Sequence, residues 1–247
     1  MKRAILLSLC ALLIVLSFGC QYETRSAGRL DPVIEAKINT LLAQMTLEEK
    51  AGQMSQKSRL GEDGSGEIET EIREGRIGSF LNLQDVKARN KLQRIAVEES
   101  RLGIPLIFGL DVIHGQRTVF PVPLGEAASW DLVLMEKTAA AAAREARAMG
   151  IDWTFSPMVD IARDPRWGRI VEGAGEDPYL GSLIARARVR GYQGRDLAAP
   201  DTLAACLKHY AVYGASQAGR DYHTTEVPMR IVRDVYLPPF QAGVEEG

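Results

Sequence analysis

Short apolar runs alternate with helix-like segments through most of this chain, and that alternation restricts the fold more than any other feature. The runs begin near residues 77, 106, 151 and 203, which indicates about four strand–helix units. Strands that are apolar on both faces and separated by helices are typical of a parallel sheet with right-handed crossovers. The sequence therefore predicts an α/β fold. An open doubly wound sheet would show the same alternation, but no Gly-x-Gly-x-x-Gly turn follows the first run.

Helix-starting and helix-stopping residues mark the segments between these runs. Asp31-Pro32 opens a helix with apolar residues on one face, and the capping box Thr46–Glu49 starts a short one that reaches Met54. Further helices are expected over 85–101, 131–149, 179–190 and 229–246, strands over 77–83, 106–112, 151–159 and 203–210, and a loop over 61–67.

The first twenty residues predict export rather than part of the fold. Lys2 and Arg3 precede an apolar run that ends at Phe18, and Gly19-Cys20 follows it. A small residue before cysteine is typical of a bacterial lipoprotein signal, in which Cys20 becomes the acylated N-terminus. An ordinary cleaved signal peptide is the alternative. We expect a signal at 1–20, a tether at 21–30 and a folded region at 31–247, in the periplasm or anchored to the outer membrane.

Composition and cysteine usage argue against several other classes. The net charge is −2, so nothing points to nucleic acid. Cys10 lies in the export signal, which leaves at most Cys20 and Cys206 and implies no disulfide framework. We expect no metal and no cofactor, because neither His-x-His nor His-Glu-x-x-His occurs and Lys208 beside His209 would repel a cation.

A long loop over 160–181 interrupts the alternation. It places three arginines among five carboxylates, and Trp167 and Tyr179 give it apolar anchors. Loops of this length inside a compact chain are commonly functional. A structural network of ion pairs that braces the loop is the alternative interpretation.

Polar residues gather at the carboxyl ends of the expected strands, where parallel α/β folds carry their chemistry. Asp111, Arg169 and the pair Lys208-His209 lie at or just beyond these ends. All three histidines, His114, His209 and His223, also fall in loops after strands. Carboxylates that accept from hydroxyls, together with Lys, Arg and His donors, suit recognition of a neutral sugar.

Several motifs carry a family resemblance. They are Leu110-Asp-Val-Ile-His-Gly-Gln-Arg-Thr-Val-Phe-Pro121, Asp164-Pro-Arg-Trp-Gly-Arg169 with Glu172, Gly175-Glu-Asp177, Lys208-His-Tyr-Ala-Val-Tyr-Gly214 and Gly219-Arg-Asp-Tyr222. In this order they resemble the N-terminal domain of glycoside hydrolase family 3, and most of all its exported bacterial β-glucosidases. The similarity runs from about Ile34 to Gly247. The N-acetylhexosaminidase branch is disfavoured, because Lys208-His209 is not followed by its Phe-Pro-Gly-His-Gly.

The resemblance implies a TIM-like (β/α)8 barrel, of which this chain would hold about the first four units. It also implies retaining hydrolysis of terminal β-D-glucosides without a cofactor. It assigns binding of the sugar hydroxyls to Asp111, Arg169, Lys208 and His209.

One departure from the family pattern limits what this chain is expected to do. Family members place the nucleophilic aspartate in a Ser-Asp-Trp or Ser-Asp-His motif, and no Ser-Asp pair occurs here. The general acid/base usually comes from a second domain. We therefore expect a fragment that is inactive alone, with both groups located after Gly247; otherwise a carboxylate such as Asp160, Glu172 or Asp221 would have to be the nucleophile. A β-xylosidase and a non-catalytic sugar-binding lipoprotein are the alternatives.

Overall fold

The protein forms one parallel five-stranded sheet with helices packed on it, seen in a computed structural model that describes residues 31–58 and 65–247. The strands follow one another across the sheet in chain order, and each neighbouring pair is parallel. They are β1 (Gln56–Ser58), β2 (Ser79–Leu81), β3 (Ile107–Leu110), β4 (Trp153–Thr154) and β5 (Ala204–Ala205). The predicted parallel α/β architecture is confirmed. The expected signal and tether at 1–30 lie outside the described residues, and the domain bounds stay a prediction.

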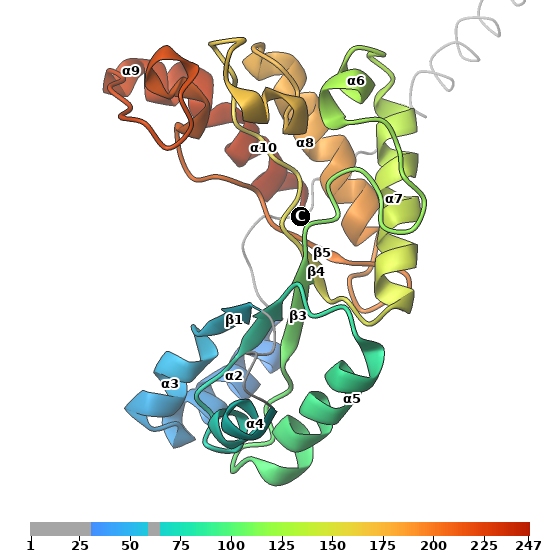
Figure 1. The fold of residues 1–247 in the computed structure, drawn as a ribbon, viewed down its shortest axis with the longest axis vertical. Coiled ribbons are helices and arrows are strands. Elements are labelled where there is room, and N and C mark those ends of the chain that lie inside the picture. Colours follow the sequence, from blue (N-terminus) through green and yellow to red (C-terminus); the bar gives the residue numbers. More distant parts are fainter. Residues whose placement is uncertain (1–30, 59–64) are drawn as a thin grey trace, which may run out of the picture.

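The helices fall into two groups along the sheet. Those before and after β1 and β2 surround one part of it, while the later ones surround the other part (Figure 1). The first group is α2 (Pro32–Gln44), α3 (Leu47–Gln53), α4 (Ser65–Arg73) and α5 (Val86–Arg94) with a π-helical turn (Ile95–Glu99). The second is α6 (Pro123–Ala127), α7 (Leu132–Ala148), α8 (Pro178–Gln193), α9 (Met229–Ile231) and α10 (Pro238–Glu246), with a π-helical turn (Val232–Tyr236) before α10. None of the described helices is long and apolar enough to cross a membrane.

The structure adds a strand that the sequence pattern did not reveal. β1 has the sequence Gln-Lys-Ser, which has no apolar residue, so it gave no strand signal. It pairs with β2 from Gln56 to Ser58, and the described residues therefore form five strands where four were expected. The predicted end of the loop over 61–67 is wrong, because α4 begins at Ser65.

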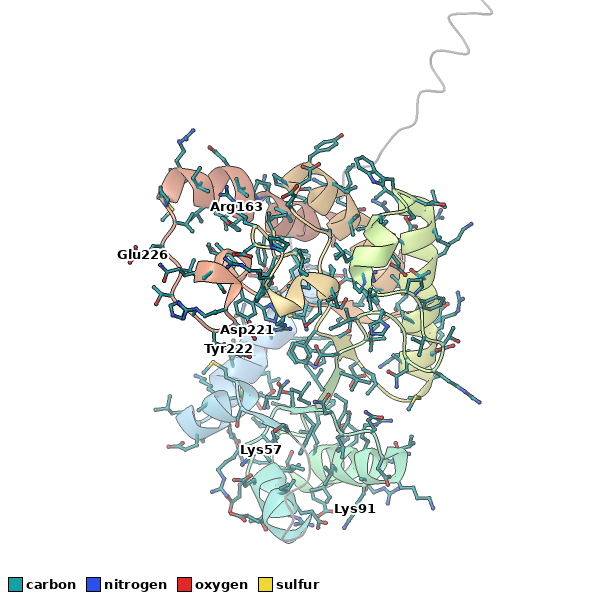
Figure 2. All side chains as sticks on the ribbon, turned by 45° about the horizontal axis from the view of Figure 1, so that its top comes forward. Lys57, Lys91, Arg163, Asp221, Tyr222 and Glu226 are labelled. Atoms are coloured by element: carbon teal, nitrogen blue, oxygen red, sulfur yellow. The ribbon has the colours of Figure 1, made fainter. Side chains whose placement is uncertain are left out.

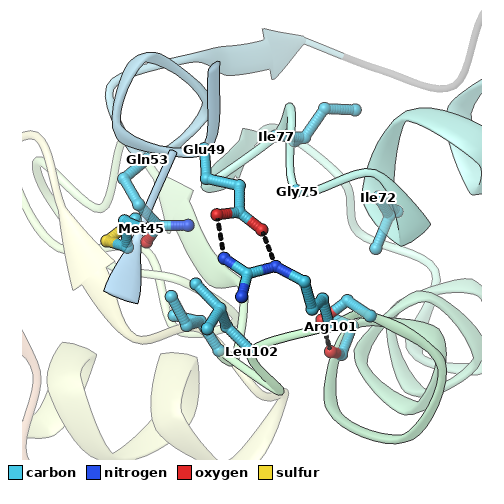
Figure 3. Close-up of a pocket in the computed structure, with 11 residues that line it drawn as sticks. Met45, Glu49, Gln53, Ile72, Gly75, Ile77, Arg101 and Leu102 are labelled. Carbon is cyan, nitrogen blue, oxygen red and sulfur yellow. Dashed lines mark hydrogen bonds and ion pairs between the residues drawn. The ribbon is translucent and has the colours of Figure 1, made fainter. Parts of the chain in front are cut away.

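An ion pair ties the first helices to the loop after α5. Arg101 donates from Nε to Glu49 Oε1 at 2.9 Å (Figure 3). Its Nη2 donates to the Gln44 carbonyl at 2.9 Å. The same Glu49 completes the predicted capping box with Thr46, which is confirmed. Glu49 therefore both caps the start of α3 and binds Arg101, which follows α5 in the chain. By contrast, α2 has no buried residue, and its apolar residues Ile34 and Ile38 are exposed.

Close packing of α7 on α8 sets the geometry near the site. The alanine-rich face of α7 packs into a core cluster with Val112, Leu203 and Tyr192. A Cβ at Gly191 of α8 would lie 2.4 Å from the Glu136 carbonyl oxygen of α7, so only glycine permits this approach. As a result, the fully buried Tyr192 reaches the end of β3.

Candidate functional site

The carboxyl ends of β3, β4 and β5 bring the predicted binding residues together. Asp111 follows β3, and Lys208 and His209 follow β5. Past the ends of the two short strands, the chains after β4 and β5 stay paired, because Val159 N donates to the Lys208 carbonyl at 2.8 Å. Since β3 and β5 both border β4, Asp111 and Lys208 meet across it.

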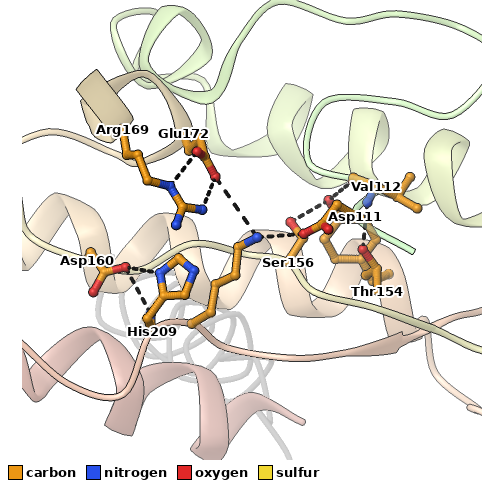
Figure 4. Close-up of polar contacts among 10 residues, drawn as sticks. Asp111, Val112, Thr154, Ser156, Asp160, Arg169, Glu172 and His209 are labelled. Atoms are coloured by element: carbon orange, nitrogen blue, oxygen red, sulfur yellow. Dashed lines mark hydrogen bonds and ion pairs between the residues drawn. The ribbon is translucent and has the colours of Figure 1, made fainter. Parts of the chain in front are cut away.

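Lys208 connects the residues of this site. Its side chain is 11% exposed, and Nζ lies 2.7 Å from Asp111 Oδ1 and 4.0 Å from Glu172 Oε2 (Figure 4). The Asp111 side chain is 41% exposed, so one face of this carboxylate is open to a ligand. A buried lysine stem that ends between two carboxylates holds its ammonium group in a defined place.

Arg169 and Glu172 form a bidentate ion pair in the 3₁₀ turn Gly168–Glu172. Arg169 Nε and Nη2 donate to Glu172 Oε1 and Oε2 at 2.7 and 2.8 Å. These bonds lower the pKa of Glu172 while burial opposes the shift, and they raise the pKa of Arg169. The guanidinium carbon of Arg169 also lies 5.3 Å from the centre of the Tyr213 ring.

The lowered pKa of Glu172 gives a pH prediction. A carboxylate whose pKa is lower in the folded than in the unfolded protein stabilises the fold at pH values above its unfolded pKa, which is near 4.5 for Glu172. This stabilisation is lost as the pH falls through the pKa of the folded state. We expect Glu172→Gln to lower the melting temperature at pH 7, with a deficit that narrows below about pH 4.5. Thermal unfolding at several pH values measures this, with Glu35→Gln on exposed α2 as the control. A deficit that is the same at every pH would show that the ionised carboxylate contributes nothing.

His209 is held by a buried carboxylate. Its backbone N and its ring Nδ1 lie 2.9 and 2.8 Å from Asp160 Oδ2, and the Asp160 side chain is 1% exposed. This contact leaves the Nε2 edge of the ring available to a ligand. Asp160 Oδ1 is buried and has no hydrogen-bond partner among the described residues.

Asp221 belongs to a third set of contacts. It accepts from Trp167 Nε1 at 3.0 Å and from the Tyr213 hydroxyl at 2.5 Å. These bonds lower the pKa of Asp221, while burial and the bond to Asp221 raise the pKa of Tyr213 to about 12. Asp221 and Tyr222 lie together on one loop, far from Lys57 of β1 and Lys91 of α5 (Figure 2).

A hollow of about 410 Å³ opens beside these contacts. Arg169 and His209 line it together with the aromatic residues Tyr210, Tyr213 and Tyr222. Its volume lies within the range of small-molecule sites. Polar side chains and aromatic faces around one hollow are suited to a polyol with an apolar ring face.

Comparison with known proteins identifies the family. The model of the glycosyl hydrolase family 3 N-terminal domain matches residues 46–247. The chain belongs to glycosyl hydrolase family 3.

Relatives in family 3 are much longer than this chain. A periplasmic β-glucosidase of Salmonella typhimurium is 39% identical over 86% of this chain, which spans 28% of that protein. A β-xylosidase of Formosa agariphila is 33% identical over 92% of the chain, again 28% of that protein. The predicted resemblance is confirmed.

Solved family 3 structures confirm the TIM-like α/β fold. The β-glucosidase of Listeria innocua in complex with glucose superposes with a TM-score of 0.78 at 38% identity, over 86% of this chain and 32% of that one. An exo-1,3/1,4-β-glucanase from Pseudoalteromonas superposes with a TM-score of 0.80 at 30% identity, over 91% of this chain and 30% of that one.

Within this family 3 chain, the structure brings together all four residues expected to bind sugar: Asp111, Arg169, Lys208 and His209. Of the three histidines expected on one face, only His209 takes part in the contacts of Figure 4. His114 instead lies 3.2 Å from the Phe120 carbonyl of its own loop, and His223 has a buried Nδ1.

Two supporting roles were not foreseen from the sequence. Glu172 lies between Arg169 and Lys208, and Asp160 holds His209. The three-residue spacing of Arg169 and Glu172 could have suggested their pairing. No local signal connects Asp160 with His209, because the two residues follow different strands, β4 and β5.

Proposed function

We propose that this chain is the sugar-binding part of a retaining β-glucosidase that hydrolyses terminal β-D-glucosides. The observation that carries the proposal is the convergence of Asp111, Arg169, Lys208 and His209 at one edge of the sheet, beside an open hollow. The names of the relatives support the substrate class, because they include β-glucosidases.

The geometry supports an assignment for each residue. Asp111, with its open face, accepts hydrogen bonds from sugar hydroxyls, while Lys208 and Arg169 donate to hydroxyl oxygens. His209, whose Nδ1 faces the Asp160 carboxylate, presents Nε2 to a further hydroxyl. Because Glu172 and Asp160 already orient Arg169 and His209, these two side chains lose little freedom when the sugar binds. The site is thus ordered before the substrate arrives.

We infer that the nucleophile and the acid/base lie after Gly247. Retaining hydrolysis uses two carboxyl groups about 5–5.5 Å apart. Three carboxylates that could stand in for the nucleophile, Asp160, Glu172 and Asp221, are each held by partners. Asp160 binds His209, Glu172 binds Arg169 and Asp221 binds Trp167 and Tyr213. The length of the relatives supports the same inference.

A β-xylosidase of the same family is the second candidate, because one relative carries that name. Xylose differs from glucose by the absence of the hydroxymethyl group at C5. The test is the hydrolysis of an aryl β-D-glucoside and an aryl β-D-xyloside by the full-length protein, with the α-anomers as controls. The full-length protein is the product of the whole open reading frame that encodes residues 1–247. Preference for the glucoside supports the proposal and preference for the xyloside supports the second candidate. Binding of glucose without any hydrolysis would support a non-catalytic sugar-binding lipoprotein.

Export is the expected route for this protein, and a relative named as periplasmic supports it. We predict that Cys20 is the mature N-terminus and carries lipid, because Gly19-Cys20 closes an apolar signal. Mass spectrometry of the mature N-terminal peptide measures this directly, with Cys20→Ser as the unlipidated control. A free amine at any other residue would show ordinary signal cleavage and a protein released from the membrane.

A further inference from the structure

A buried polar cluster lies beneath the loop that carries Asp111. It consists of Glu126 of α6, Thr154 of β4, Ser156 just after β4, and Arg188 and Tyr192 of α8. Tyr192, Thr154 and Ser156 are 0% exposed, Arg188 is 4% exposed and Glu126 is 6% exposed. None of these residues is among those proposed to bind sugar.

The contacts of this cluster converge on the two residues after Asp111. Val112 N donates to Thr154 Oγ1 at 3.0 Å, and the Val112 carbonyl accepts from the Tyr192 hydroxyl at 2.8 Å (Figure 4). The Ile113 carbonyl accepts from Arg188 Nη1 at 3.1 Å. Because β3 ends at Leu110, these backbone groups have left the sheet and need such partners.

The cluster also holds itself in place. The Tyr192 hydroxyl lies 2.9 Å from Ser156 Oγ and 3.5 Å from Arg188 Nη1, and Arg188 pairs with Glu126. A buried arginine–glutamate pair is a poor source of stability compared with apolar residues of similar size. Its position under Asp111 is better explained by the backbone groups that it orders.

We propose that Tyr192, with Arg188 and Thr154, is a positioning residue for Asp111. Through the backbone of Val112 and Ile113, it keeps the Asp111 carboxylate opposite Lys208 and open to the sugar. The proposal rests on the proposed function, and it adds residues that touch no substrate.

Tyr192→Phe tests the proposal, because it removes one oxygen and keeps the ring. In the full-length protein, assayed well below its melting temperature, we expect kcat/KM for an aryl β-glucoside to fall roughly three- to tenfold. The inhibition constant for glucose should rise by a similar factor. Tyr236→Phe, at a buried tyrosine before α10, is the matched control and should leave both values unchanged.

A double-mutant cycle separates positioning from simple stabilisation. In an Asp111→Asn background, Tyr192→Phe should change kcat/KM by less than about twofold, because the group that it positions is already impaired. If Tyr192→Phe lowers kcat/KM by the same factor with Asp111 and with Asn at position 111, the proposal is overturned in favour of a purely structural role. The proposal is also overturned if Tyr192→Phe has wild-type kinetics while Asp111→Asn is impaired. If Asp111→Asn itself has normal kinetics, the proposed sugar site is wrong and the positioning role falls with it.

Thr154→Val gives a second variant on another element, in case Tyr192→Phe does not fold. It removes the hydroxyl that accepts from Val112 N and keeps a similar shape. We expect Thr154→Val to lower kcat/KM roughly three- to tenfold, as for Tyr192→Phe. In the Asp111→Asn background, its effect should likewise be less than about twofold. Unchanged kinetics in folded Thr154→Val would overturn its part in the proposal.

Discussion

Asp111→Asn in the full-length protein is expected to reduce kcat/KM for an aryl β-glucoside about a hundredfold or more, while the melting temperature changes little. The carboxylate lies 2.7 Å from Lys208 Nζ, with its other face open to the sugar. Charge-assisted hydrogen bonds contribute roughly 1.5–3 kcal/mol each, and a carboxylate that accepts from two hydroxyls would lose both with its charge.

A matched control is available in Asp131. Asp131 caps α7 by accepting from Leu134 N at 2.9 Å, and asparagine caps helices equally well. Asp131→Asn should therefore leave both activity and stability unchanged. Normal kinetics with a lowered melting temperature in Asp111→Asn would instead assign Asp111 a structural role.

The two basic partners extend this prediction. Lys208→Ala should impair kcat/KM as strongly as Asp111→Asn, because it also leaves Asp111 without its cation. His209→Ala should be milder, because the ring has only Nε2 left for a hydrogen bond to the sugar. A larger loss for His209 than for Lys208 would contradict this ranking.

Residues 21–247 expressed alone are expected to hydrolyse no aryl β-glucoside. The carboxylates that could replace the nucleophile, Asp160, Glu172 and Asp221, are all engaged by neighbouring side chains. In the described part of the chain, β1 and β5 form the two sheet edges, and α2 exposes an apolar face. Such surfaces favour aggregation or dye binding.

The measurement compares this segment with the full-length protein under identical conditions. The longer protein should unfold cooperatively and turn over substrate. If the segment alone were active, a carboxylate of this chain would be the nucleophile, and Asp160→Asn, Glu172→Gln and Asp221→Asn would test the three named candidates. That outcome would refute our inference that the nucleophile lies after Gly247.

Local sequence patterns were sufficient for the fold class, and the motifs for the family. The patterns also placed the four residues expected to bind sugar at or just beyond the ends of strands. Apolar runs ending at Asp111 and Lys208 placed these residues at the carboxyl ends of parallel strands, where a sheet of this type gathers polar groups. Caps such as Asp31, Thr46 and Asp131 marked helix starts correctly. These signals are legible in the sequence because a cap or a strand end depends on a few adjacent residues.

Partnerships between distant segments were decided only by the tertiary structure. Lys208 and Asp111 are 97 residues apart, and His209 and Asp160 are 49 apart. Tyr192 reaches the Val112 carbonyl across 80 residues because glycine and alanine let α8 pack closely on α7. β1 likewise forms from three polar residues only because β2 offers its edge. Each of these contacts depends on which strands are neighbours and how closely helices approach, and no local pattern encodes either.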